Sequence, residues 1–159
     1  MTDNTNLKGI AQTTEWFRRA VPEPNTRTFE VQLGVHLEEI AEMLTALGLP
    51  NQELHTTSLD LKQGHYTDFL DNGLKMNPVR IELLDALGDQ SVTNTGLAYM
   101  LGMDLEGALD EINRSNFTKF DSEGMPLKNE QGKIIKNPDT YEPPELKPFA
   151  NLFEEEETE

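Results

Sequence analysis

Cysteine is absent from the 159-residue sequence. Its absence excludes a disulfide framework and any chemistry that needs a thiolate as nucleophile or metal ligand. No stretch reaches the roughly 18 consecutive apolar residues of a transmembrane helix. The N-terminus also lacks the basic start and apolar run of a signal peptide. These absences lead us to expect a soluble cytoplasmic protein with no membrane partner.

Positive charge is scarce. The chain has 13 Lys and Arg against 29 Asp and Glu, a formal net charge of −16. Such a surplus of negative charge argues against binding to the phosphate backbone of nucleic acid, so we expect no direct nucleic-acid contact. An acidic site that holds a metal ion can nevertheless accept a phosphate, because the ion inverts the local field.

The hydrophobic periodicity is that of helices. It predicts helices over 6–20, 31–47, 58–70, 79–102 and 105–116, and therefore an all-α helical bundle. From residue 117 onward the sequence is rich in proline, glycine and lysine, which predicts a long irregular C-terminal segment that carries lysines. We expect one domain over residues 1–150 and a disordered acidic tail over 151–159, which ends in FEEEETE.

Carboxylates cluster on two of the predicted helices. Glu38, Glu39 and Glu42 share one sector of the helix over 31–47, where they repel one another unless a cation lies among them. Glu82, Asp85 and Asp89 share a face of the helix over 79–102. If the two helices pack antiparallel, the carboxylates converge and suit Mg²⁺ or Mn²⁺ better than zinc, since no Cys or His accompanies them. The alternative is a pair of ordinary solvated faces.

The irregular segment concentrates five of the 13 basic residues, Lys119, Lys128, Lys133, Lys136 and Lys147. Ammonium groups beside an acidic metal site are suited to polyphosphate chemistry, although a solvated surface loop explains them too. Trp16, the single tryptophan, is either a core anchor or a stacking surface for a nucleobase.

With these residues in place, the chain resembles the all-α nucleoside triphosphate pyrophosphohydrolases, the MazG-like and phosphoribosyl-ATP pyrophosphohydrolase superfamily. The resemblance is carried by Glu38-Glu39-Ile40-Ala41-Glu42, by Asp85-Ala86-Leu87-Gly88-Asp89, by Ser115-Asn116-Phe117-Thr118-Lys119 and by Gly132-Lys133-Ile134-Ile135-Lys136. Three features depart from the family pattern: Ala86 replaces a common glutamate, Gln131 replaces an aspartate, and residues 51–77 lengthen the interval between the acidic motifs. Both Asp85 and the Glu82–Asp85 pair fit the second motif, so either remains a candidate.

The resemblance implies a function and a set of roles. The implied reaction is Mg²⁺- or Mn²⁺-dependent hydrolysis of a nucleoside triphosphate to the monophosphate and pyrophosphate. It implies that Glu38 and Glu39 are catalytic, with Glu38 orienting or deprotonating the attacking water. The ions would be held by Glu39, Glu42, Asp85 and Asp89, and the substrate by Trp16, Asn116, Lys119, Lys133 and Lys136.

The sequence is also similar to bacteriophage MazZ-type members of this superfamily, which act on dGTP and dATP. That similarity implies purine substrates, a host-cytoplasmic location, and a homodimer or homotetramer with sites near the subunit interface.

A second interpretation has no catalysis. An acidic helical protein can mimic DNA or inhibit a basic partner, and the net charge is compatible with that role. A mimic needs acids spread over its surface, however, whereas here they are gathered among Leu and Val on two helices. We therefore favour the enzyme.

Overall fold

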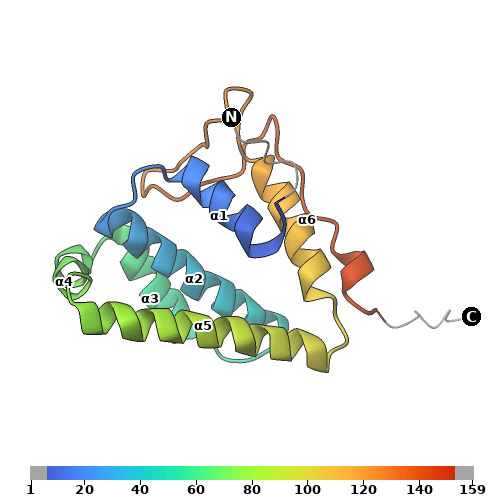
Figure 1. The fold of residues 1–159 in the computed structure, drawn as a ribbon, viewed down its shortest axis with the longest axis horizontal. Helices are drawn as coiled ribbons and strands as arrows, with labels where there is room; N and C mark the ends of the chain where they lie inside the picture. Colours follow the sequence, from blue (N-terminus) through green and yellow to red (C-terminus); the bar gives the residue numbers. More distant parts are fainter. Residues whose placement is uncertain (1–6, 153–159) are drawn as a thin grey trace, which may run out of the picture.

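The computed structural model describes residues 7–152, and within them it contains six α-helices, one short 3₁₀ helix and no strand. The predicted all-α class is confirmed (Figure 1). The elements are α1 (Gly9–Ala20), α2 (Thr26–Ala46), α3 (Gln52–Gln63), α4 (Thr67–Gly73), α5 (Asn77–Met100), α6 (Leu105–Phe117) and η1 (Lys147–Phe149). Almost all of the acidic tail predicted over 151–159 lies outside the described residues. No described helix has the length and apolarity to cross a lipid bilayer.

Helices α2 and α3 form the tightest pair in the structure. They run antiparallel and touch at Gly34, whose carbonyl oxygen accepts a hydrogen bond from the buried hydroxyl of Ser58 at 2.8 Å. A Cβ atom at position 34 would lie 2.8 Å from the Ser58 carbonyl oxygen and 2.8 Å from Cγ of Lys62. Glycine is therefore required here because α3 occupies the space of a side chain.

The single helix predicted over 58–70 is wrong. The chain forms α3 and α4 instead, because Gly64 adopts a left-handed conformation (φ 88°) and its N–H bonds back to the Asp60 and Leu61 carbonyls. This is a common way for a helix to end, and glycine adopts it without steric cost. Helix α2 likewise begins five residues before the predicted start, since Asn25 and Thr28 form a reciprocal capping box.

A fully buried carboxylate holds the corner between α3 and α4. Glu30 accepts hydrogen bonds from the Tyr66 amide at 2.8 Å and from the Thr67 hydroxyl. Arg27 lies 3.4 Å from the same carboxylate and donates to the Leu61 carbonyl. The charge of Glu30 is thus paired and hydrogen-bonded, which is the condition under which a protein tolerates a buried carboxylate.

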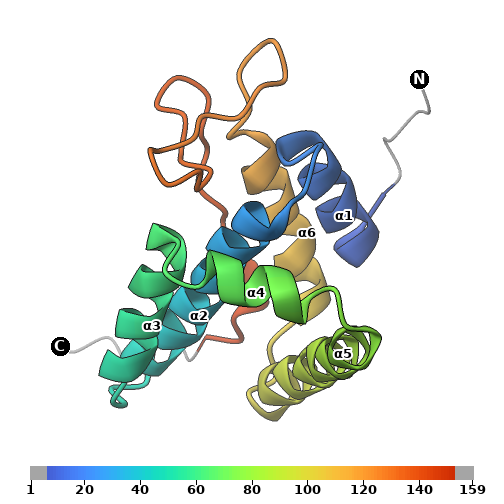
Figure 2. The same cartoon turned by 90° about the vertical axis from the view of Figure 1, so that its left-hand side faces the viewer.

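A second core joins α1 and α6 beneath the irregular segment 118–146. Trp16, Ala20 and Phe120 are buried together, and the indole N–H of Trp16 donates to the Asn116 carbonyl at 2.8 Å. Buried Asn113 ties the helices again by donating to the Gly9 carbonyl at 3.0 Å. The segment is attached to this core through Phe120 and Ile134, so the loops seen above α1 in Figure 2 have an apolar anchor.

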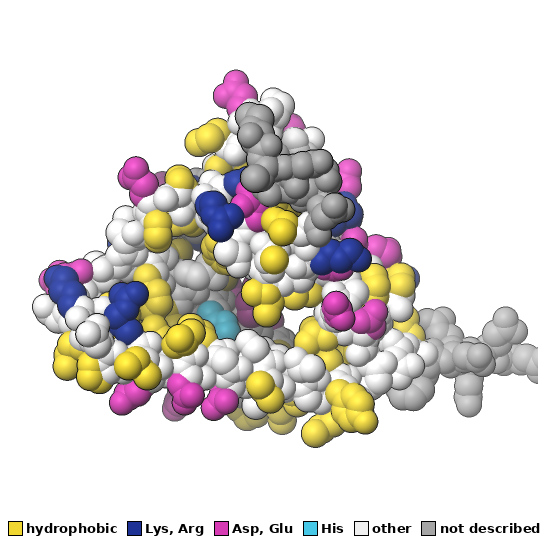
Figure 3. Space-filling view, in the orientation of Figure 1, with side chains coloured by type: hydrophobic (Ala, Val, Ile, Leu, Met, Phe, Trp, Pro, Cys, Tyr) yellow, Lys and Arg dark blue, Asp and Glu magenta, His cyan; other side chains and the backbone are white. Residues whose placement is uncertain are grey.

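Helix α5 lies apart from these cores. It contains no buried residue, and its close backbone neighbour among the described elements is α6. The antiparallel packing against α2 that would let the carboxylates converge is not formed: in Figure 1 both helices run from left to right. A hydrogen bond between the His36 ring and the Gln90 side chain links them. Hydrophobic and acidic side chains both project from the exposed edge over α5 in Figure 3.

The contact at Gly34 makes a test of the fold. Gly34→Ala places a methyl group against backbone that cannot move without separating α2 from α3, so we expect the free energy of unfolding to fall by about 1–3 kcal/mol. Gly73→Ala is the matched control, because nothing lies within 4 Å of its new Cβ; it should leave stability unchanged or raise it by up to ~1 kcal/mol. Urea denaturation measures both. Equal stability of the two variants would contradict the close contact.

Candidate functional site

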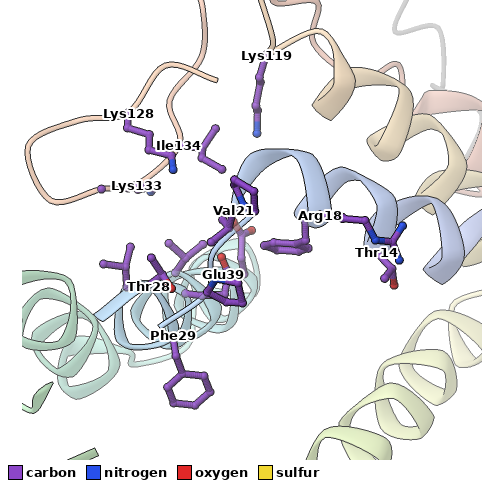
Figure 4. A pocket seen from close by; sticks show the side chains of 17 residues that line it. Thr14, Arg18, Val21, Thr28, Phe29, Glu39, Lys119, Lys128, Lys133 and Ile134 are labelled. Atoms are coloured by element: carbon purple, nitrogen blue, oxygen red, sulfur yellow. The ribbon is translucent and has the colours of Figure 1, made fainter. Parts of the chain in front are cut away.

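A pocket of about 540 Å³ opens between α1, the first half of α2 and the irregular segment. Figure 4 shows Lys119, Lys128 and Lys133 approaching from the segment, opposite Glu39 and Thr28 on α2. Its apolar lining residues are Phe17, Val21, Pro22, Pro24, Phe29, Val31, Val35 and Ile134. The pocket therefore combines a mostly apolar wall with charged groups on one side.

Four cationic side chains line the pocket: Arg18 from α1, Lys119 after α6, and Lys128 and Lys133 from the loop. Among the described lining residues, Glu39 is the one carboxylate. A chain with a net charge of −16 thus places a local surplus of positive charge here. An anion with an apolar part is the ligand that such a lining favours.

Glu38 stands beside the pocket and links two lysines from distant parts of the chain. Its Oε1 atom lies 3.0 Å from Nζ of Lys62 on α3, and its Oε2 atom accepts from Nζ of Lys133. Burial acts to raise the pKa of Glu38, but the hydrogen bonds from Lys133 and Lys62 outweigh it and hold that pKa below its usual value. A carboxylate engaged in this way is a weaker proton acceptor than a free glutamate.

Glu39 has the opposite electrostatic balance. Burial raises its pKa, and the negative charges of Glu42 and Glu38 raise it further, against the lowering effect of Lys133 and Lys119. The carboxylates of α2 therefore repel one another as the sequence predicts, and the lysines relieve only part of the repulsion. A cation beside Glu39 and Glu42 would relieve the rest.

Lys119 is held at the inner end of the lysine group. Its Nζ atom lies 6.0 Å from the centre of the Trp16 ring. Burial is the main cause that lowers the pKa of Lys119, and the charges of Lys136 and Lys133 act in the same direction. Lys136 itself lies over the Tyr141 ring, 5.0 Å from its centre. The lysines thus lie close enough to repel one another, and an anionic ligand would remove that repulsion.

The structure gathers some of the predicted site residues and separates others. Glu39, Lys119 and Lys133 line the pocket, and Glu38 contacts Lys133. Trp16, Asn116 and Lys136 do not line it; Trp16 lies in the core, as its structural interpretation predicts. The metal-binding and substrate-binding roles of these residues stay predictions.

The predicted metal ligands do not come together within one chain. Asp85 and Asp89 are exposed on α5. Over residues 7–152, no three side chains of His, Cys, Asp or Glu are grouped so that they could hold one ion. The two carboxylates on α2, Glu39 and Glu42, remain together as neighbours one helical turn apart.

Sequence reasoning missed three charged residues of this region. Lys128 was noted as one of the lysines of the irregular segment but was not assigned to the site. Nothing in the sequence pointed to Arg18 on α1. Lys62 gave no signal either, because its pairing with Glu38 depends on how α3 packs against α2.

Comparison of the chain with protein-family models, with curated proteins and with solved structures found no match. The comparisons therefore assign the chain to no family, and the pocket is the structural feature that bears on its function.

The Glu38 carboxylate, which both Lys62 and Lys133 bind, should stabilise the protein to an extent that depends on pH. Because the pKa of Glu38 is lowered on folding, its ion pairs stabilise the protein above pH 4.5, the ordinary value, and this stabilisation is lost as the pH falls through the folded-state pKa. Glu38→Gln should lower the free energy of unfolding by about 1–3 kcal/mol at neutral pH.

The difference in the free energy of unfolding between the wild type and Glu38→Gln should become smaller below pH 4.5. Urea denaturation at pH 7, 5 and 4 measures it, with the exposed Glu53→Gln as control. A deficit of the same size at all three values would contradict the pairing.

Proposed function

We propose that the protein is a Mg²⁺- or Mn²⁺-dependent nucleoside triphosphate pyrophosphohydrolase, which releases a nucleoside monophosphate and pyrophosphate. The observation that carries the proposal is that three lysines of the irregular segment, Lys119, Lys128 and Lys133, lie opposite Glu39 in one mostly apolar pocket. Purine deoxynucleotides, dGTP and dATP, are the first substrates to test, and that preference comes from the sequence resemblance alone.

The pocket residues have separate tasks in this proposal. Lys119, Lys128 and Lys133 bind the phosphate chain and neutralise the charge that grows on the pyrophosphate leaving group. The apolar wall contacts the nucleoside and excludes water. Glu38 is not assigned a proton-transfer role, since both of its oxygens accept from lysines.

The donor set on α2 fits a magnesium-type ion. Glu39 and Glu42 are hard oxygen donors whose mutual repulsion raises the pKa of Glu39. Mg²⁺ is commonly bound through one or two carboxylates together with substrate phosphates, so two glutamates meet this need. Bound there, the ion would supply charge neutralisation and a more acidic water molecule.

The reaction is tested by product analysis. The wild-type protein with Mg²⁺ or Mn²⁺ should convert at least one nucleoside triphosphate to monophosphate and pyrophosphate, separated by ion-exchange chromatography. Glu42→Gln should lower turnover by about 100-fold or more with the helical circular dichroism unchanged. Glu53→Gln, which removes an exposed charge on α3, should keep full activity.

The failed outcomes are distinct. Orthophosphate as the product would indicate a different phosphohydrolase. No turnover of any nucleotide, with a melting temperature that Mg²⁺ does not raise, would favour the acidic binding protein instead.

We also propose that α5 packs against a second copy of the chain. Its apolar residues are spread around the helix rather than along one stripe, a pattern typical of an enclosed helix. Ile81, Leu84, Val92, Tyr99 and Met100 are all at least 69% exposed. A monomer would leave these side chains in water.

The total surface supports an incomplete assembly. The chain exposes 12097 Å², whereas a compact monomer of its mass exposes about 8,000 Å². The difference exceeds the area that one subunit buries in a stable dimer, or in a dimer of dimers.

Light scattering during gel filtration tests the assembly. The wild-type protein should elute with a mass at least twice 18.0 kDa. Leu84→Glu should shift it to the monomer, because a charge cannot be buried unpaired in an apolar interface. Ile10→Glu is the matched control, since Ile10 on α1 and Leu84 are both 72% exposed. A wild-type monomer at micromolar concentration would overturn the proposal.

A further inference from the structure

Lys62 is a buried lysine that lies next to the pocket without lining it. It is 7% exposed, on α3, at the point where α3 packs against Gly34 of α2. Its ammonium group lies 3.0 Å from Glu38. Burial of a lysine is costly unless its charge is paired, and the α2–α3 contact makes the exchange of this partner difficult.

Glu38 therefore divides one negative charge between two ammonium groups. Lys62 takes Oε1 and Lys133 takes Oε2. The group of three carries a net charge of +1, and Lys133 is the member that lines the pocket. Without Lys62, the whole charge of Glu38 would face Lys133, and the pair would be neutral.

The backbone of Lys133 is fixed by a separate set of contacts. Its N–H donates to the Asn129 side chain at 2.9 Å, and its carbonyl accepts from the Asn129 amide at 3.0 Å. Ile134 packs on the Trp16 core. The loop is thus held whether or not Lys62 is charged, which leaves the direction and charge of the Lys133 side chain as the property that Lys62 controls.

We propose that Lys62 is a positioning residue: by binding one oxygen of Glu38, it fixes the direction of that carboxylate and keeps the positive charge of Lys133 available to a phosphate chain. The proposal rests on the proposed function in one respect, that the pocket binds a phosphate chain.

A double-mutant cycle tests this role with inorganic triphosphate as the probe, in EDTA and about 50 mM salt, by isothermal titration calorimetry. Lys62→Met should weaken binding about 5- to 20-fold. In a protein that already carries Lys133→Met, Lys62→Met should lower the affinity for triphosphate by less than 2-fold, because Lys62 acts through Lys133. Lys62→Arg should keep most of the affinity. Lys75→Met removes a charge from the exposed Lys75–Asp71 pair and should have no effect.

Amine acetylation, followed by mass spectrometry, provides a readout without ligand. In Lys62→Met, Lys133 pairs with Glu38 alone and should be acetylated more slowly than in the wild type, with Lys128 unchanged. A merely structural role for Lys62 predicts the reverse, since a loosened loop would expose Lys133 and speed its acetylation.

The outcomes separate the two proposals. Failure of wild-type protein to bind triphosphate both in EDTA and with Mg²⁺ present overturns the proposed function, and acetylation then decides the pairing by itself. The role of Lys62 would be overturned, and the proposed function would not, if Lys62→Met left triphosphate binding unchanged. The same holds if the losses of binding free energy in the two single variants added fully in the double variant.

Discussion

The close approach of α2 and α3 at Gly34 is the contact on which the site depends. Because position 34 has no side chain, α3 lies directly against α2, and Ser58 bonds to its backbone. This packing buries Lys62 beside Glu38, which in turn binds Lys133 of a loop almost a hundred residues further along the chain. One backbone contact thus connects the helical pair to the lysine side of the pocket.

The charges of the site differ in sign from those of the whole chain. Although the formal net charge is −16, the pocket is lined by four cations and one carboxylate. Two of the cations are held in different ways: Lys133 is bound by the Glu38 carboxylate, and Lys119 is partly buried with its ammonium group over the Trp16 ring. Such prearranged positive charge binds an anion without a large cost of reorganisation.

Helix α5 leaves large apolar side chains exposed on the single chain. Asp85 and Asp89 are exposed, as are apolar residues such as Leu84 and Val92, and a hydrogen bond between His36 and Gln90 joins the helix to α2. Contacts with another copy would enclose the apolar residues. They would also change the surroundings of the two aspartates, so the metal-binding roles that the resemblance implies for them depend on assembly.

Features that depend on near neighbours in the chain could be predicted from the sequence. Helical periodicity and the Glu38–Glu42 sector follow from spacings of three and four residues, which place side chains on one helix face. The end of α3 at Gly64 and the pairing of Lys62 with Glu38 could not be predicted, because both depend on how the chain packs in three dimensions. Such pairings join residues far apart in the chain, and no local spacing encodes which faces of two helices will meet.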